Sequence, residues 1–239
     1  MQKSELSKYK KVQQIANETM SYLGSYLHAG LSESDVAAAA REFMSARDVS
    51  SFWYYDVAAL VLVGSRTVKS ISGKHYAPTT IKIKDNDIVT VDLSPELDSY
   101  WGDLARTFVI ERGNVITRPS KHSTKKTHEL FAGIHAEKTL HKHLCKVATP
   151  DSSFEEIYSR LNRVIDKLGY VNLDFKKNLG HSIEKRKEDR VYMETGCEVR
   201  LSEVDFFTFE PHIKLKGSGF GYKWEDIYYF SGTQLKKIG

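Results

Sequence analysis

The sequence predicts an α+β fold made of two similar halves, spanning roughly residues 1–115 and 116–239. Two observations support this prediction. The order of helical stretches followed by strand-like segments occurs twice, and one strand motif recurs without a gap. Helical stretches carry apolar residues at three- and four-residue spacings, whereas strand-like runs are rich in β-branched and aromatic residues. We therefore expect residues 1–239 to form one domain with internal pseudo-symmetry.

The first half begins with a helical pattern whose apolar residues run from Val12 to Leu27. Ser32 and Asp35 have the spacing of a capping box, although Asp replaces the usual Glu or Gln, and they predict a second helix over 36–46. Apolar, β-branched and aromatic runs separated by turn residues then predict strands.

The second half repeats this order. Residues 128–147 predict a helix whose inner face carries Leu130, Ile134, Leu140 and Leu144. Ser152 with Glu155 has the spacing of another capping box, which predicts a further helix through residues 157–170. Strand-like segments fill the rest of the chain.

The repeated strand motif places carboxylates at matched positions. The segment "IKDNDIVTVD" (residues 83–92) aligns with "LSEVDFFTFE" (residues 201–210), so that Asp92 matches Glu210. A second acidic residue follows each of them, Asp103 in the first half and Glu225 in the second. A histidine precedes each pair; these are His75 in "GKHYAP" and His181 in "NLGHSI".

Carboxylates within apolar strands predict a metal centre. One such Asp is commonly satisfied by backbone N–H groups, but four at matched positions need a shared explanation, because burial of an unpaired charge costs several kcal/mol. Two halves packed about a pseudo-twofold axis would bring the four together, where they repel. Two divalent ions would resolve the repulsion, and oxygen ligands with imidazole suit Mn, Fe or Co, with Zn a further candidate. Two ions about 3.5–4 Å apart lower the pKa of a shared water, which is hydrolase chemistry.

The composition argues against several other functions. The net charge of +4 is small and basic residues are interleaved with acidic ones, so no nucleic-acid partner is expected. No apolar run reaches the ~20 residues of a membrane span, and the N-terminus lacks the apolar core of a signal peptide. Cys145 and Cys197 lie too far apart to suggest a metal-type pair, and a cytoplasmic location is the simplest expectation. The oligomeric state stays open, with a homodimer as one option.

The order of these motifs resembles the pita-bread metallopeptidases, which include methionine aminopeptidases, Xaa-Pro aminopeptidases and prolidases. The resemblance covers nearly the whole chain: Asp92 in "VDLS" is separated by ten residues from Asp103 in "GDLARTF", and "LGHSI", "FEPH" and "WEDI" follow. It implies a pita-bread fold, with helices packed on a curved antiparallel sheet, as a single catalytic domain. It also implies a dinuclear metal-dependent exopeptidase whose partner is a peptide with a free N-terminus.

The resemblance also assigns roles. The implied metal ligands are Asp92, Asp103, His181, Glu210 and Glu225. Asp92 would chelate one ion, near which the substrate amino group would bind. His181 and Glu210 would serve the other, with Asp103 and Glu225 bridging. Glu210 would also be the general base, and His75 would hydrogen-bond the scissile carbonyl or the tetrahedral intermediate.

One stretch departs from the family pattern. The family carries a second histidine soon after the metal-ligating one, but here the chain reads "GHSIEKRKEDRVYMETG", with Ser182 and Glu184 in place of small residues. The next histidine is His212, directly after "EP". Either His212 supplies the missing imidazole, or it is only a strand-end residue.

The motifs favour one branch of the family over another. The altered stretch lacks the methionine aminopeptidase signature, and "HYAP" is closer to the Xaa-Pro enzymes. A methionine aminopeptidase-like enzyme, a non-catalytic binding module of the same fold and a metal-independent hydrolase of amidino substrates are the alternatives. The aromatic run "SFWYYD" (residues 51–56) is expected in the core, with substrate-pocket lining as the alternative.

Overall fold

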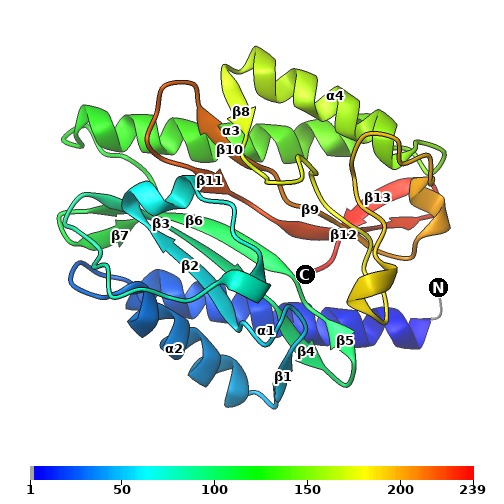
Figure 1. Ribbon diagram of the computed structural model, residues 1–239, viewed down its shortest axis with the longest axis horizontal. Helices are drawn as coiled ribbons and strands as arrows, with labels where there is room; N and C mark the ends of the chain where they lie inside the picture. The colour runs from blue at the N-terminus through cyan, green and yellow to red at the C-terminus, as the bar shows by residue number, and fades with distance from the viewer. Residues whose placement is uncertain (1–2) are drawn as a thin grey trace.

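The computed structural model describes residues 3–239, and its two halves each place two helices outside antiparallel strands. Figure 1 shows α1 (Lys3–Tyr26) and α2 (Glu33–Ser45) along one side, with α3 (Lys125–Val147) and α4 (Phe154–Lys167) along the opposite side. The strands lie between these helix pairs. Within the described range, no helix combines the length and apolar character that a bilayer crossing requires.

The strands of the first half form two antiparallel sheets, with the orders β2-β3-β6-β7 and β1-β4-β5. Two short 3₁₀ turns, η1 (Gly64–Val68) and η2 (Gly73–His75), lie between β2 and β3. The strands are β1 (Ser51–Phe52), β2 (Ala59–Val63), β3 (Asp87–Leu93), β4 (Pro95–Leu97), β5 (Tyr100–Trp101), β6 (Leu104–Glu111) and β7 (Asn114–Ile116).

The strands of the second half form sheets with the orders β13-β12-β9 and β11-β10-β8, again antiparallel. Two further 3₁₀ turns, η3 (Lys187–Asp189) and η4 (Leu201–Glu203), lie between β8 and β9. The strands are β8 (Tyr170–Asn172), β9 (Phe207–Phe209), β10 (His212–Leu215), β11 (Tyr222–Lys223), β12 (Asp226–Ser231) and β13 (Gln234–Lys237).

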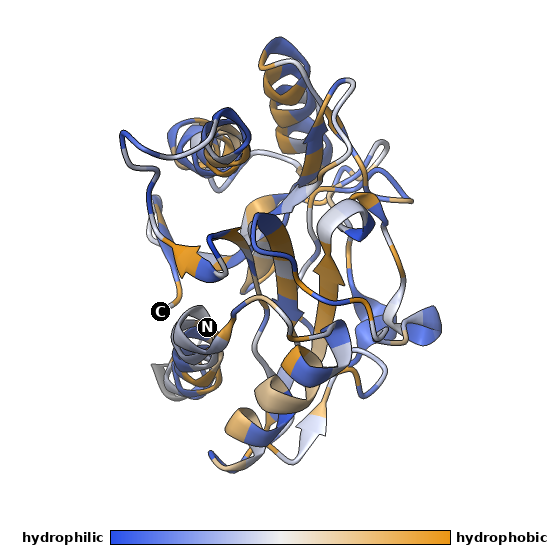
Figure 2. Cartoon of the chain, turned by 90° about the vertical axis from the view of Figure 1, so that its left-hand side faces the viewer, coloured by the Kyte–Doolittle hydropathy of each residue, from blue (hydrophilic) through white to orange (hydrophobic). Residues whose placement is uncertain are grey.

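Each half has a main hydrophobic core between helices and sheet, and a third apolar cluster, which includes Trp53, Phe206 and Ile227, joins the two halves. In α4 the apolar residues follow helical spacing and face inward, with Phe154, Ile157, Leu161 and Ile165 all buried. The predicted inner face of α3 is buried as well. Figure 2 shows the hydrophobic colour concentrated in the strands and on the inner sides of the helices. Burial of these faces supplies the main free energy that holds each helix pair on its sheet.

The helix starts confirm one predicted capping box and correct the other. Ser32 and Asp35 cap α2 reciprocally, as predicted. The box at α4 is Ser153 with Glu156, one residue later than the predicted Ser152 with Glu155. The Ser152 hydroxyl instead accepts a hydrogen bond from Thr149 N–H in the preceding turn. The helix also ends at Lys167, earlier than predicted, because Gly169 turns the chain into β8.

The carboxylate-bearing strand pairs occupy equivalent places in the two halves. β3 pairs with β6 so that Leu93 lies opposite Leu104, and β9 pairs with β12 so that Phe209 lies opposite Asp226. Asp92 and Asp103 therefore lie at one end of the first pair, and Glu210 and Glu225 flank the corresponding end of the second. The repeat found in the sequence is a repeat of structure.

The buried carboxylate of Glu33 anchors the loop that carries His75 to α2 and β2. Glu33, fully buried at the start of α2, accepts hydrogen bonds from the backbone N–H groups of Val63 and Thr79, both 3.0 Å. The Thr79 hydroxyl at 2.7 Å and Arg66 Nε at 2.7 Å complete its partners. Both oxygens of the Glu33 carboxylate accept hydrogen bonds, so this buried charge stabilises the fold. An apolar side chain at the same position could not accept them.

We expect Glu33→Ala to lower the free energy of unfolding by about 3–5 kcal/mol, because it leaves Arg66 and two buried N–H donors without partners. Urea denaturation measures the change. Glu42→Ala, an exposed position on the same helix, is the matched control and should stay within about 0.5 kcal/mol of the wild type. Equal effects of the two substitutions would contradict this role for Glu33.

Candidate metal centre

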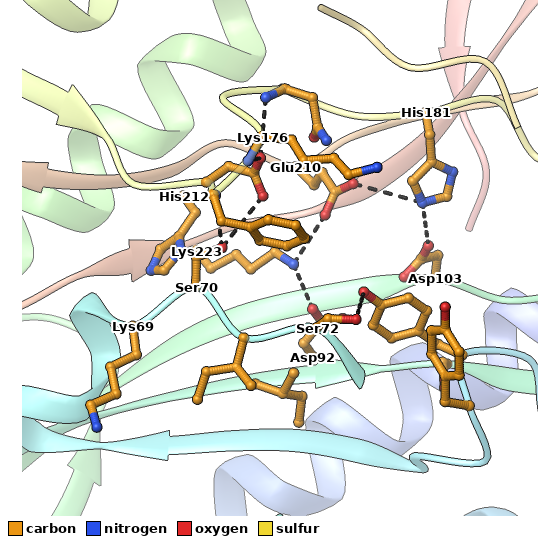
Figure 3. Close-up of a pocket in the computed structure, with 18 of the residues that line it drawn as sticks. Lys69, Ser70, Ser72, Asp92, Asp103, Lys176, His181, Glu210, His212 and Lys223 are labelled. Atoms are coloured by element: carbon orange, nitrogen blue, oxygen red, sulfur yellow. Dashed lines mark hydrogen bonds and ion pairs between the residues drawn. The ribbon is translucent and has the colours of Figure 1, made fainter. Parts of the chain in front are cut away.

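The predicted site residues gather around one cavity between the two halves. The cavity has a volume of about 380 Å³, and His75, Asp92, Asp103, His181, Glu210 and His212 line it. Glu225 lies beneath them and is 1% exposed. Figure 3 shows residues of both halves pointing into the same space, which is the convergence that the repeat predicted.

Helix α1 positions Asp103 through a residue that the sequence did not single out. The fully buried amide of Gln13 donates to the Asp103 carbonyl at 2.8 Å and accepts from the Asp103 N–H at 3.0 Å. Asp103 precedes β6, where it has no ladder partner, so these two bonds replace the missing pairing. The Asp103 carboxylate is left free to face the cavity.

The backbone of the first half also positions Glu225. Its N–H donates to the Ala105 carbonyl at 3.0 Å, and Arg106 donates to its carbonyl at 2.6 Å. Glu225 and Asp103 therefore come from different halves but are tied to the same stretch of β6. Both Glu225 carboxylate oxygens are buried and lack any hydrogen-bond partner among the described residues.

His181 presents the correct ring nitrogen to this space. Its Nδ1 lies 2.8 Å from the Ser182 carbonyl, and because a carbonyl only accepts, Nδ1 must carry the proton. Nε2 then has a free lone pair, which is the form that binds a metal. The residue before it must be glycine, because a Cβ on Gly180 would lie 2.2 Å from the Thr208 carbonyl oxygen.

Asp103, His181 and Glu225 together fit a divalent cation. One ligand atom from each lies within 4.8 Å of the others, and all three residues are buried. His181 Nε2 is 3.5 Å from Asp103 Oδ2 and 3.7 Å from Glu210 Oε1. Two carboxylates and an unprotonated imidazole are ligands that Mn, Fe, Co and Zn accept. The unpartnered oxygens of Glu225 are explained if they face such an ion.

Asp92 and Glu210 have a different partner, Lys223. The Lys223 ammonium Nζ lies 2.5 Å from Asp92 Oδ2 and 3.0 Å from Glu210 Oε2. Figure 3 shows the lysine side chain reaching between the two carboxylates from β11. The sequence motifs do not single out Lys223, although its position two residues before Glu225 in an extended segment is the available signal.

The charges in the site perturb one another. Burial first, and then the neighbouring carboxylates, raise the pKa values of Asp103 and Glu225 well above the ordinary range. Burial also raises the pKa of Asp92. Burial would raise the pKa of Glu210 too, but Lys223 and His181 outweigh it and lower that pKa. Burial and the carboxylates oppose each other at Lys223, and the carboxylates win, so its pKa is raised.

Burial lowers the pKa of His181 to about 4, which keeps its ring neutral at pH 7. His212 has the same pKa, about 4, for the same reason. Its Nε2 lies 2.7 Å from the Thr67 carbonyl, so the ring donates a hydrogen bond to the first half. His75 lies on η2 at the edge of the cavity with an exposed side chain.

The aromatic run of residues 51–56 takes part in both the core and the cavity. Trp53 is buried, stacks on Trp101 at 4.7 Å between ring centroids, and also lines the cavity with Tyr54 and Tyr55. The Arg190 guanidinium lies 5.0 Å from the centroid of the Trp53 ring, a cation–π contact. The run therefore contributes both to the core and to the cavity wall, and Trp53 does both.

Comparison with known proteins agrees with this geometry. Residues 7–231 match the profile of metallopeptidase family M24. The chain is 28% identical over 171 residues to a Xaa-Pro dipeptidase of Lactobacillus helveticus, covering 72% of this chain and 39% of that protein. It is 26% identical over 144 residues to a methionine aminopeptidase of Rickettsia prowazekii, covering 58% of this chain and 49% of the relative. The chain thus spans less than half the length of either relative.

A solved structure supports the fold. The X-Pro aminopeptidase from Thermotoga maritima superposes with a TM-score of 0.80 at 18% identity, over 100% of this chain and 61% of that one. The predicted pita-bread fold is confirmed.

The raised carboxyl pKa values predict how metal affects stability across the pH range. In the metal-free protein, the stability that protonated Asp103 and Glu225 contribute is complete below their unfolded pKa of about 4 and is lost as pH rises through their raised folded values. A bound cation replaces those protons, so Mn²⁺ should raise the melting temperature more at pH 8 than at pH 5. Thermal melts with Mn²⁺ or with chelator measure this difference. A pH-independent difference would contradict it.

Proposed function

Because the chain belongs to metallopeptidase family M24, we propose that it is a metal-dependent exopeptidase that removes the N-terminal residue from peptides. One observation carries the proposal: the free Nε2 of His181 and the unpartnered carboxylate of Glu225 converge with Asp103 on one buried point. Mn, Co or Fe is the expected metal, with Zn as the alternative. Asp92 and Glu210, which complete the predicted two-ion ligand set, each have one oxygen in contact with Lys223.

The residues around that point suit peptide-bond hydrolysis. A divalent ion, when bound, polarises a carbonyl and lowers the pKa of water. Glu210 faces the same point, 3.7 Å from His181, and is kept ionised by Lys223. It is therefore placed to take a proton from the attacking water and pass it to the departing amine. The substrate amino group would lie on the Asp92 side.

The two histidines outside the metal group have different proposed roles. His75, exposed at the cavity edge, would donate a hydrogen bond to the scissile carbonyl. His212 lines the same cavity, but one of its nitrogens is engaged by Thr67. This anchoring gives the ring a defined orientation, which substrate positioning needs, and it also suits a purely structural role.

The substrate preference we propose is Xaa-Pro, supported by the similarity to a Xaa-Pro dipeptidase. Methionine aminopeptidase-like activity is the second candidate, because a curated methionine aminopeptidase is similar as well. Cleavage of two peptide series, one with proline second and one with methionine first, separates these candidates. We also propose a cytoplasmic location, with which the free thiols of Cys145 and Cys197 are consistent.

A non-catalytic binding module is the alternative from another class. The contact of Lys223 with Asp92 and Glu210 favours it, since two of the five predicted ligands already have a cationic partner. Failure of the folded protein to bind metal and to cleave both peptide series would establish this alternative.

We expect Glu210→Gln to lower kcat/KM by about 10²–10⁴-fold, because glutamine cannot accept the proton from water. Steady-state kinetics on the preferred peptide measures this loss. Glu198→Gln, an exposed position outside the cavity lining, is the matched control and should retain wild-type activity. Unchanged activity of the Glu210 variant, with metal bound, would remove Glu210 from the role of base.

His212→Ala tests whether the imidazole positions substrate. If it does, turnover falls by 10-fold or more while metal content per chain stays unchanged. Kinetics and metal analysis on the same preparation give both numbers. Small and equal losses in both would instead assign His212 to the structure of the strand end.

A further inference from the structure

The Lys223 ammonium lies where a second cation would have to bind. It contacts carboxylates of both halves, Asp92 at 2.5 Å and Glu210 at 3.0 Å. Neither carboxylate belongs to the described group of close ligand atoms, which contains only Asp103, His181 and Glu225. The four acidic residues therefore differ in their partners: Asp103 and Glu225 lie with His181, Asp92 contacts Lys223, and Glu210 contacts Lys223 through Oε2 while its Oε1 lies 3.7 Å from His181.

The backbone holds Lys223 firmly in this place. Its N–H donates to the Thr107 hydroxyl at 2.9 Å, and its carbonyl accepts from the same hydroxyl at 2.9 Å. Lys223 also pairs with His212 in the β10–β11 ladder. Only 19% of its side chain is exposed. These backbone contacts therefore fix the strand that carries the Lys223 ammonium.

Repulsion between cations supports one ion with Lys223 in place. Two divalent ions with a shared hydroxide and the Lys223 ammonium would balance four ionised carboxylates, so net charge alone does not choose between one ion and two. The ammonium contacts both Asp92 and Glu210, and a second divalent ion bound to the same two carboxylates would repel it at close range. One divalent ion and one ammonium avoid that contact.

We propose that Lys223 takes the place of the second cation, so that the chain binds one divalent ion, through Asp103, His181 and Glu225. This inference rests on the proposed metal centre and departs from the two-ion arrangement expected from sequence. The rival explanation is that Lys223 only supports Asp92 beside a complete two-ion centre.

The number of ions per chain decides between them. The full-length protein is stripped with chelator, reloaded with excess Co²⁺, freed of unbound ion and analysed for cobalt by mass spectrometry. We expect one ion in the wild type and two in Lys223→Met, which keeps an unbranched side chain one atom shorter and removes the charge. Lys69→Met is the matched control, since Lys69 lines the same cavity but points away from the carboxylates (Figure 3), and it should keep one ion.

Substitution of the ligands gives a test that does not depend on the lysine variant. Asp92→Asn should keep one ion, whereas Asp103→Asn should lose it. Two ions in the wild type, one ion in a folded Lys223→Met protein, or loss of an ion in Asp92→Asn would overturn the inference. Circular dichroism checks folding. If Lys223→Met does not fold, the wild type and the two aspartate variants still decide.

Peptide cleavage is measured separately on the same samples. A wild type that binds one ion and cleaves no peptide would keep the Lys223 inference and remove the proposed exopeptidase function. A wild type that binds two ions and cleaves peptides would do the reverse. The two proposals therefore fail by different results.

Discussion

Repulsion among four carboxylates in one largely buried space is the constraint on which this structure depends. Asp92, Asp103, Glu210 and Glu225 all approach the same cavity, and burial makes each charge more costly. Such a cluster persists at neutral pH only if cations balance it or some of its carboxyl groups stay protonated. The chain supplies one cation itself, the Lys223 ammonium, and leaves Asp103 and Glu225 beside an unprotonated imidazole nitrogen. The proposed metal ion would relieve this imbalance.

Backbone hydrogen bonds fix the residues that carry this concentration of charge. Gln13 on α1 brackets the backbone of Asp103, and β6 holds the backbone of Glu225 through Ala105. The backbone N–H and carbonyl of both Asp103 and Glu225 are therefore hydrogen-bonded. The ring of His181 is oriented in a similar way by the neighbouring Ser182 carbonyl. The two halves meet at the site, and their alignment decides its geometry.

Much of this arrangement could be predicted from the sequence because it is repeated in the sequence. The gapless match of residues 83–92 with 201–210 paired Asp92 with Glu210, and in the structure both lie near the ends of corresponding strands, although Asp92 pairs with Ala105 in the β3–β6 ladder whereas Glu210 lies just beyond β9. Short-range signals were less exact: the second capping box is shifted by one residue, since Ser152 is used by the preceding turn. The role of Gln13 could not be predicted, because its partner lies 90 residues away and a glutamine on an amphipathic helix carries no local signal.

The sequence by itself determined which chemical groups are available and that they occur in two matched sets, because helix and strand periodicity and the acidic repeat are local properties of the chain. It also determined the family resemblance, which the profile match confirms. Only the tertiary structure decided the partners of the acidic groups: Asp103 and Glu225 lie with His181, Asp92 contacts Lys223, and Glu210 lies between Lys223 and His181. The reason is physical. Which charges neutralise one another depends on distances across the interface of the two halves, and a linear pattern does not contain those distances.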